Sequence, residues 1–173
     1  MKKKINVFDY AGDIMKALDK GVLITTKADG KVDSMTLGWG TLGIDWSLPV
    51  FTAYIRKSRF TKEQLEKNPE FTVNVPYGAF DPKILGVCGS KSGRDMDKAK
   101  ELGLTLVDPE VISVPVTLEC RVVCVEKQDT DTMPEEILKE HYPSEKPTPF
   151  GGSLENYHYA FYGQIVSAYM IED

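Results

Sequence analysis

The sequence predicts a mainly β protein with short helices, built as a β-barrel or a sandwich with helical decoration. Short runs rich in Val, Ile, Thr, Tyr and Phe recur along the chain, and Gly, Pro, Asn and Asp bound them. The helical patterns between these runs are brief, which favours a sheet with helical additions over a helical bundle. With 173 residues and 42% hydrophobic composition, we expect one domain, residues 1–173, with a real core.

In the first half of the chain, a helix is followed by a series of strands. Apolar spacing predicts the helix from Phe8 to Lys20, and Gly21 is placed to end it. The turn signal Ala28-Asp29-Gly30 predicts a hairpin. Strands are expected at Val22–Thr26, Val32–Thr36, Val50–Arg56 and Phe71–Val75.

Three helices and two long strands complete the expected elements. Thr61 and Gln64 have the spacing of a capping box, so Thr61 is the predicted N-cap of a short helix that Asn68-Pro69 ends. Proline in a first turn predicts the last helix. The remaining expectations are a helix at Met96–Leu102, a strand at Val111–Gln128 with an edge or bulge at Pro115, a helix at Pro134–Tyr142, a loop at Pro143–Gly152 and a strand at Tyr157–Ile171.

Composition excludes several classes of protein. The formal net charge is −5, so no basic surface indicates nucleic-acid binding. No apolar run approaches the roughly 18 residues that span a bilayer, and the basic start lacks the apolar stretch of a signal peptide. We therefore expect a cytoplasmic protein without a membrane partner. Three cysteines argue against a disulfide framework, and no Cys/His cluster has metal-ligand spacing.

The glycine-rich run from Ser34 to Gly43 is the most informative stretch. Glycines let a backbone approach a flat ligand closely, and the run carries hydroxyls and one large aromatic, Trp39. Its G-x-G-x-x-G spacing is weak evidence for dinucleotide binding, because no helical pattern follows. A plain glycine-rich turn between two strands is the alternative. Trp39 is either a wall of a ligand site or a core anchor.

Two polar clusters precede helical patterns, where free N–H groups attract anions. The first is Ser58-Arg59-Phe60-Thr61, and the second runs from Cys88 to Asp95 with Ser, Lys, Gly and Arg. Either cluster suits a phosphate. The alternatives are an ordinary capped helix for the first cluster and a solvated loop for the second. Cys88 is either a reactive thiol at an anion site or an inert buried thiol.

Taken in order, these motifs resemble the flavin reductase-like proteins, the FMN-binding split-barrel proteins of the flavoredoxin type. The resemblance rests on Ser34-Met35-Thr36-x-x-Trp39-Gly40, the Ser58 and Cys88 clusters, Phe71–Pro76 and the ending His158–Val166, and it spans about Leu18 to Ile171. It implies a Greek-key split β-barrel that binds FMN without a covalent bond near a homodimer interface.

The resemblance also implies positions for the site. The segment from Ser34 to Trp39 would line the isoalloxazine ring. Ser58, Arg59 and Thr61 would hold the phosphate, and the second cluster would close over the ribityl-phosphate end from the same or the neighbouring subunit. The full set of implied FMN-binding residues is Ser34, Met35, Thr36, Leu37, Trp39, Ser58, Arg59, Thr61, Asn74, Cys88, Gly89, Ser92, Gly93, Arg94 and His158.

Three functional hypotheses follow. The first is an FMN-dependent oxidoreductase that takes hydride from NADH or NADPH and passes electrons to a free flavin, a small molecule or a partner protein, with no protein acid or base required. The second is a flavoredoxin-type electron-transfer protein without a nicotinamide site, whose acidic balance suits a basic redox partner. The third is a structural barrel without a cofactor. In the oxidoreductase, the Pro143–Gly152 loop would act as a lid.

Overall fold

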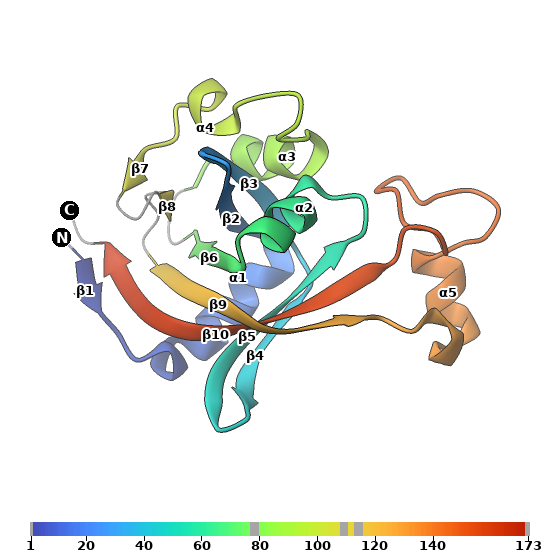
Figure 1. Cartoon of the computed structure of the whole chain (residues 1–173), viewed down its shortest axis with the longest axis horizontal. Coiled ribbons are helices and arrows are strands. Elements are labelled where there is room, and N and C mark those ends of the chain that lie inside the picture. Colours follow the sequence, from blue (N-terminus) through green and yellow to red (C-terminus); the bar gives the residue numbers. More distant parts are fainter. Residues whose placement is uncertain (1, 77–79, 108–110, 113–115, 172–173) are drawn as a thin grey trace.

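Eight antiparallel strands form one sheet in the computed structural model, which describes residues 2–76, 80–107, 111–112 and 116–171 (Figure 1). The strand order is β3-β2-β6-β9-β10-β5-β4, and β1 pairs with the end of β10. The bounds are β1 Lys2–Lys4, β2 Val22–Ala28, β3 Lys31–Leu37, β4 Gly40–Asp45, β5 Leu48–Arg56, β6 Glu70–Val75, β9 Val116–Lys127 and β10 His158–Ile171. Two short strands, β7 (Leu106–Val107) and β8 (Val111–Ile112), pair separately.

The link between β3 and β4 shows why this sheet must curl. The two strands stand at opposite ends of the strand order, about 29 Å apart if the sheet were flat at roughly 4.8 Å per strand. Gly38 and Trp39 alone connect them, and such a link reaches about 11 Å at most. The edges are therefore brought together, which confirms the expected split barrel. The Trp39 carbonyl accepts a hydrogen bond from Tyr54 N at 3.1 Å beside the split.

The helices cover the barrel at different places. The 3₁₀ helix η1 (Val7–Tyr10) and α1 (Ala11–Lys20) bury Val7, Ile14 and Leu18 in the barrel core. Helix α2 (Phe60–Lys67) packs against β2, and α3 (Pro82–Ser90) packs against β3. The short α4 (Lys98–Glu101) also contacts β3.

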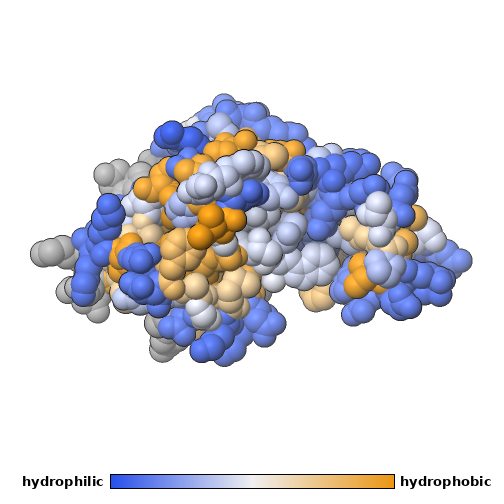
Figure 2. Space-filling view, turned by 90° about the horizontal axis from the view of Figure 1, so that it is seen from below, coloured by the Kyte–Doolittle hydropathy of each residue, from blue (hydrophilic) through white to orange (hydrophobic). Residues whose placement is uncertain are grey.

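The last helix belongs to a lobe that projects from the barrel. The 3₁₀ helix η2 (Thr130–Thr132) and α5 (Glu135–His141) lie between β9 and β10, and Figure 1 shows α5 at the end furthest from β1. Figure 2 shows apolar residues gathered over the barrel on one face, while the lobe that carries α5 is mostly hydrophilic. The barrel therefore holds the main core, and the lobe is an addition outside that core.

Most expected strands are confirmed within one or two residues, but some expectations about helices are wrong. The capping box is absent, because Arg59 is the N-cap of α2 and makes no side-chain capping bond. Thr61 Oγ1 instead donates to Met35 Sδ at 3.4 Å, and Gln64 Nε2 donates to Lys31 O at 2.9 Å. Tertiary contacts outcompete the local cap for both side chains.

Four other segments differ from expectation. The helix expected at Met96–Leu102 spans only Lys98–Glu101, with Asp97 as N-cap. The Val111–Gln128 stretch forms two strands, and Pro115 lies outside the described residues. The glycine run ends in a strand, β4, rather than in a plain turn, and Cys88-Gly89-Ser90 is the last turn of α3 rather than a loop.

Candidate functional site

Two adjoining pockets open on the side of the barrel where β3, α2 and α3 meet. They share Met35, Arg59, Ser90 and Phe150. The polar pocket is also lined by Asp33, Ser58, Phe60, Thr61, Lys91, Ser92, Gly93, Arg94, Lys98, Gly151 and Asn156. The wide pocket is also lined by Thr36, Leu37, Gly38, Trp39, Tyr54, Arg56, Leu85, Gly86, Gly89, Pro149 and His158. The wide pocket encloses about 610 Å³, within the usual range for small-molecule sites.

Arg59 stands between the two pockets. It is positioned as the N-cap of α2, directly after β5, and its Nη1 donates to the Gly89 carbonyl at 2.7 Å. Burial lowers the pKa of this guanidinium, and the nearby Asp33 carboxylate opposes the shift. The group is still a cation at neutral pH, because an arginine pKa starts so high. Its partner here is a neutral carbonyl, so its charge is available to an anion.

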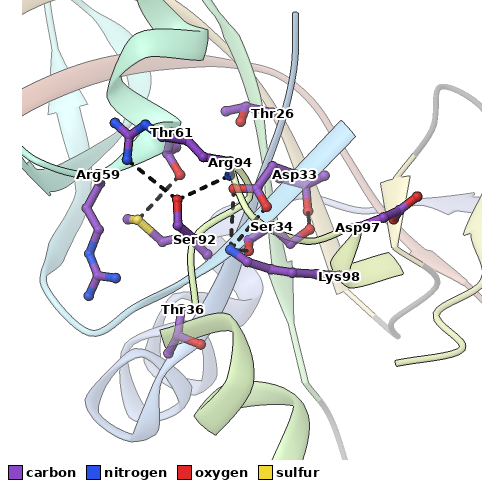
Figure 3. A network of polar contacts seen from close by, with 12 residues as sticks. Thr26, Asp33, Ser34, Thr36, Arg59, Thr61, Ser92, Arg94, Asp97 and Lys98 are labelled. Atoms are coloured by element: carbon purple, nitrogen blue, oxygen red, sulfur yellow. Dashed lines mark hydrogen bonds and ion pairs between the residues drawn. The ribbon is translucent and has the colours of Figure 1, made fainter. Parts of the chain in front are cut away.

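A buried ion pair forms the floor of the polar pocket. Lys98 Nζ lies 3.0 Å from Asp33 Oδ1 and donates to the Ser34 carbonyl at 2.7 Å (Figure 3). Both side chains are about 97% buried or more. Burial raises the pKa of Asp33, and the Lys98 ammonium opposes that shift. Breaking such a pair would leave an uncompensated buried charge, so the pair anchors the start of α4 to β3.

Gly93 lets the 91–97 segment lie directly on this ion pair. A Cβ at position 93 would stand 2.3 Å from Asp33 Oδ1, closer than atoms can approach. The segment is thereby held against β3, and Ser92 and Arg94 reach the pocket from it (Figure 3). Only glycine, which has no Cβ, allows this close approach.

Arg94 closes the polar pocket at its rim. Its Nη2 forms an ion pair with Glu63 of α2, and both Nη atoms lie 3.4 Å from the Ser58 carbonyl. The guanidinium also lies over the Phe60 ring, 5.4 Å from its centroid. The bond from Arg94 is the main cause of a lowered pKa at Glu63. Arg94 thus ties the 91–97 segment to the first turn of α2.

The wide pocket is built mainly from backbone and aromatic surface. Its wall is the end of β3 and the Gly38-Trp39 link, which the split of the barrel places between two sheet edges. Thr36 Oγ1 donates to the Leu85 carbonyl at 2.6 Å, so this hydroxyl joins β3 to α3. Trp39 is 39% exposed, which favours a ligand wall over a core anchor.

A neutral histidine lies behind Trp39. The His158 ring centroid is 4.6 Å from that of Trp39, and His158 Nδ1 is hydrogen-bonded to the Tyr142 hydroxyl. Burial, followed by the charges of Arg56 and Arg59, lowers the pKa of His158 to about 3. At neutral pH the imidazole is therefore uncharged. Its neighbour in the strand register, Arg56, has a buried Nε that lacks a hydrogen-bond partner among the described residues.

Phe150 is held at the rim shared by both pockets. Its carbonyl accepts from Arg56 Nη1, and its side chain is 82% exposed. The turn is braced by Thr148 N to Gly152 O at 2.9 Å and by Asn156 Nδ2 to Gly151 O at 2.7 Å. An aromatic side chain is thus presented to solvent from a well-bonded turn in the Pro143–Gly152 loop.

The structure brings most of the sequence-predicted residues to these pockets. Met35, Thr36, Leu37, Trp39, Arg59, Gly89 and His158 line the wide pocket, and Ser58, Thr61, Ser92, Gly93 and Arg94 line the polar pocket. Ser34, Asn74 and Cys88 line neither. Ser34 Oγ and Asn74 Oδ1 lie 2.8 and 2.7 Å from Thr25 Oγ1, inside the sheet. Cys88 is fully buried, and burial raises its pKa to about 11, which favours the inert thiol.

Sequence reasoning did not single out Asp33, Lys98, Arg56, Phe150 or Asn156 as site residues. Asp33 and Lys98 are separated by 65 positions, so their pairing had no local signal. Arg56 ends a predicted strand next to the first polar cluster, and a cation at that place was an available signal. Phe150 lies in a loop noted only for its length and composition.

The part of the chain that the structure describes lacks two features. Across residues 2–76, 80–107, 111–112 and 116–171, no helix is long and apolar enough to cross a membrane. Within the same ranges, no three His, Cys, Asp or Glu side chains gather as a metal site would require.

Comparison with known proteins identifies the family. No curated protein matches the chain. Among solved structures, flavoredoxin from Methanosarcina acetivorans is 26% identical over 88% of this chain and 68% of its own, with a TM-score of 0.61. An FMN-binding domain of a flavin reductases-like enzyme from Shewanella baltica OS155 covers 98% of this chain and 77% of its own, at 17% identity and a TM-score of 0.64.

A third structure is an NADH:FAD oxidoreductase from Streptomyces globisporus C-1027, 16% identical over 87% of this chain and 75% of its own, with a TM-score of 0.61. At such identities the second and third structures show likeness of fold alone. The flavin reductase like domain model matches residues 15–173, which is nearly the whole chain. The chain therefore belongs to the flavin reductase like domain family.

Proposed function

We propose that this protein binds FMN in the two adjoining pockets and acts as an NAD(P)H-dependent flavin reductase-like oxidoreductase. The observation that carries the proposal is the junction at Arg59, where a small cationic pocket adjoins a wider and less charged one. This division matches a ligand with a phosphate at one end and a planar ring at the other.

The polar pocket fits a phosphate in charge and in donor chemistry. Arg59, Lys91, Arg94 and Lys98 line it, whereas the carboxylates of Asp33 and Glu63 already pair with Lys98 and Arg94. The charges of Arg59 and Lys91 are thus left to a dianion. The hydroxyl-bearing residues Ser58 and Ser92 line the same pocket, and Thr61 lines it as well although its hydroxyl donates to Met35 Sδ. Arginine is well suited to phosphate because it offers several N–H groups in one plane.

The wide pocket fits the flavin ring in shape and polarity. Its wall from Met35 to Trp39 offers backbone N–H groups to a polar ring edge and apolar side chains to the ring face. The buried Arg56 Nε lacks a hydrogen-bond partner among the described residues, and a buried donor usually has one. A hydrogen-bond acceptor on the ligand would supply the partner that Arg56 Nε lacks.

When bound, FMN would supply the redox chemistry. The chain's own residues bind and orient it: Arg59 holds the phosphate end, and Trp39 with His158 fixes one wall of the ring site. His158 is neutral at physiological pH and is engaged by Tyr142, so it acts as a positioning group and not as a proton donor. Phe150 and Trp39 at the exposed rim are the surfaces that a nicotinamide ring would meet.

Electron transfer from a protein partner is the second candidate function. The net charge of −5 favours association with a basic redox protein. That function would use the same FMN site without NADH or NADPH. The two functions differ in whether a nicotinamide reduces the bound flavin directly.

A homodimer is also part of the proposal. Its support is the family resemblance and several large apolar side chains exposed on strands, among them Ile44 at 71% and Val166 at 50%. Exposed apolar surface of this kind is common where chains associate. Light scattering at micromolar concentration should give twice the mass of one chain, and a monomer mass would contradict the homodimer.

The test of function is an absorbance spectrum of the purified protein, recorded before and after anaerobic addition of NADH or NADPH. Flavin bands that bleach with one nucleotide would support the reductase and name its donor. Flavin bands that persist with both nucleotides would favour the electron-transfer function. A protein without bands that also fails to bind added FMN would contradict the flavoprotein proposal.

A further inference from the structure

Glu63 is an acidic residue beside the pocket that, on the proposed function, receives the phosphate of FMN. Glu63 does not line the polar pocket, but its carboxylate is ion-paired with Arg94, which does. A carboxylate that is paired with Arg94 repels a phosphate dianion that approaches the same guanidinium. It also occupies the guanidinium that the phosphate would use.

The cations of the polar pocket differ in how their charge is engaged. Lys98 is neutralised by the fully buried Asp33, and this pair cannot be opened without stranding a charge. Arg59 is bonded to a carbonyl, so its charge is free. Arg94 is paired with a carboxylate that is itself about half exposed, at 49%. The Arg94–Glu63 pair is therefore weak enough to be exchanged for another anion.

The geometry around Arg94 shows that it would keep its place during such an exchange. The two Nη atoms also contact the Ser58 carbonyl at 3.4 Å, and the guanidinium lies over Phe60 at 5.4 Å. Its backbone N donates to Ser92 Oγ at 3.2 Å. Arg94 can thus release Glu63 and remain at the rim through contacts that carry no opposing charge.

We propose that Glu63 is a specificity-determining residue that competes with the ligand's phosphate for Arg94. Its carboxylate weakens the binding of FMN relative to riboflavin, which has no phosphate to compete. The pair thereby makes the phosphate end of the site exchangeable, whereas Arg59 holds the phosphate without a rival. The chain would release FMN more readily than the number of its cations suggests.

The test uses the full-length protein and two isosteric variants. Glu63→Gln removes the charge but keeps an oxygen that can accept from Arg94, so the position of Arg94 is preserved. Glu66→Gln is the matched control: Glu66 lies one turn further along α2, and its carboxylate pairs with Lys62 rather than with Arg94. Both variants change net charge equally. The measurement is the Kd of FMN and of riboflavin by fluorescence titration at low and at physiological salt.

We expect Glu63→Gln to bind FMN about 3- to 10-fold more tightly at low salt, with riboflavin affinity unchanged and the gain reduced by salt. Glu66→Gln should change FMN affinity less than about twofold, because its charge lies further from Arg94. Unchanged or weaker FMN binding in Glu63→Gln, or an equal gain in both variants, would overturn the inference while leaving the proposed function intact. A wild-type protein that binds neither flavin would instead overturn the proposed function.

Discussion

In the polar pocket, most charged groups already hold a partner from the chain, whereas the wide pocket contains few charges and relies on shape. Lys98 is paired with Asp33 and Arg94 with Glu63, so the polar pocket is assembled before any ligand arrives. The wide pocket is formed by the barrel split, the Trp39 link and a histidine kept neutral by burial. One end of the site is thus preorganised by ion pairs, and the other by packing.

This difference predicts which substitutions should affect ligand binding and which should affect folding. Arg59 lines both pockets, and its guanidinium is bonded to a carbonyl rather than to a carboxylate. Gly93 and Asp33 support the polar pocket from beneath. His158 and Tyr142 support the wide pocket from behind. Substitutions at these positions can therefore separate an effect on ligand binding from an effect on stability.

The largest effect is expected from Arg59→Gln, which removes a cation that lines both pockets and is bonded to a carbonyl. We expect FMN affinity to fall roughly 30- to 300-fold, because charge-assisted hydrogen bonds to phosphate are among the strongest. Riboflavin affinity should fall much less. Titration of both flavins checks this, with Lys57→Gln as the control for net charge, since Lys57 lines neither pocket. Equal losses for the two flavins would show that Arg59 does not hold the phosphate.

The next effect is expected from Gly93→Ala, which should lower the free energy of unfolding by about 2 kcal/mol. The added Cβ would meet Asp33 Oδ1 at 2.3 Å, so the ion pair or the 91–97 segment must shift. Gly12→Ala is the matched control, because it lies in α1 with open space around it, and it should be neutral or slightly stabilising. Denaturant unfolding of both variants measures the difference. A tolerated Gly93→Ala would mean that the polar pocket is not built on close approach.

Sequence patterns predicted the barrel well because its strands have local signals. Alternating apolar residues and turn glycines mark β2, β3, β5, β6 and β10 without reference to the rest of the chain. Helix α3 was missed because Gly86 and Gly89 lie within it, and glycine is a poor helix former. Packing against β3 stabilises it instead, a contact that no local pattern reports.

The site was predictable where its residues are grouped along the chain and not where they pair over long distances. Ser58-Arg59 and Ser92-Gly93-Arg94 are short clusters, and both reach the polar pocket. The Asp33–Lys98 pair and the Thr61–Met35 contact join distant segments. A local rule could assign Thr61 only to a cap, and the tertiary contact took its hydroxyl instead.

The third prediction tests the neutrality of the wide pocket through pH. The folded state lowers the pKa of His158 to about 3, so below pH 6.5 the unfolded chain binds a proton that the folded chain does not. The neutral His158 therefore leaves the free energy of unfolding at its full value above pH 6.5, and this free energy falls as the pH drops from 6.5 toward 3. Between pH 7 and 5, wild type should lose about 2 kcal/mol more stability than His158→Gln. Parallel losses in the two proteins, measured by denaturant unfolding, would contradict a buried neutral histidine.

The smallest effect is expected from Tyr142→Phe, which removes the hydroxyl that contacts His158 Nδ1 and lies 3.2 Å from Gln128 Oε1. Tyr142 lines neither pocket, so FMN affinity should change less than about twofold, while stability should fall by about 1 kcal/mol. Tyr162→Phe removes the same atom from an exposed bond to Glu126 at 2.8 Å and should cost less, because water replaces an exposed partner. If Tyr142→Phe instead weakens FMN binding strongly, the hydroxyl orients His158 toward the ligand. The wide pocket would then depend on a directed hydrogen bond and not on packing alone.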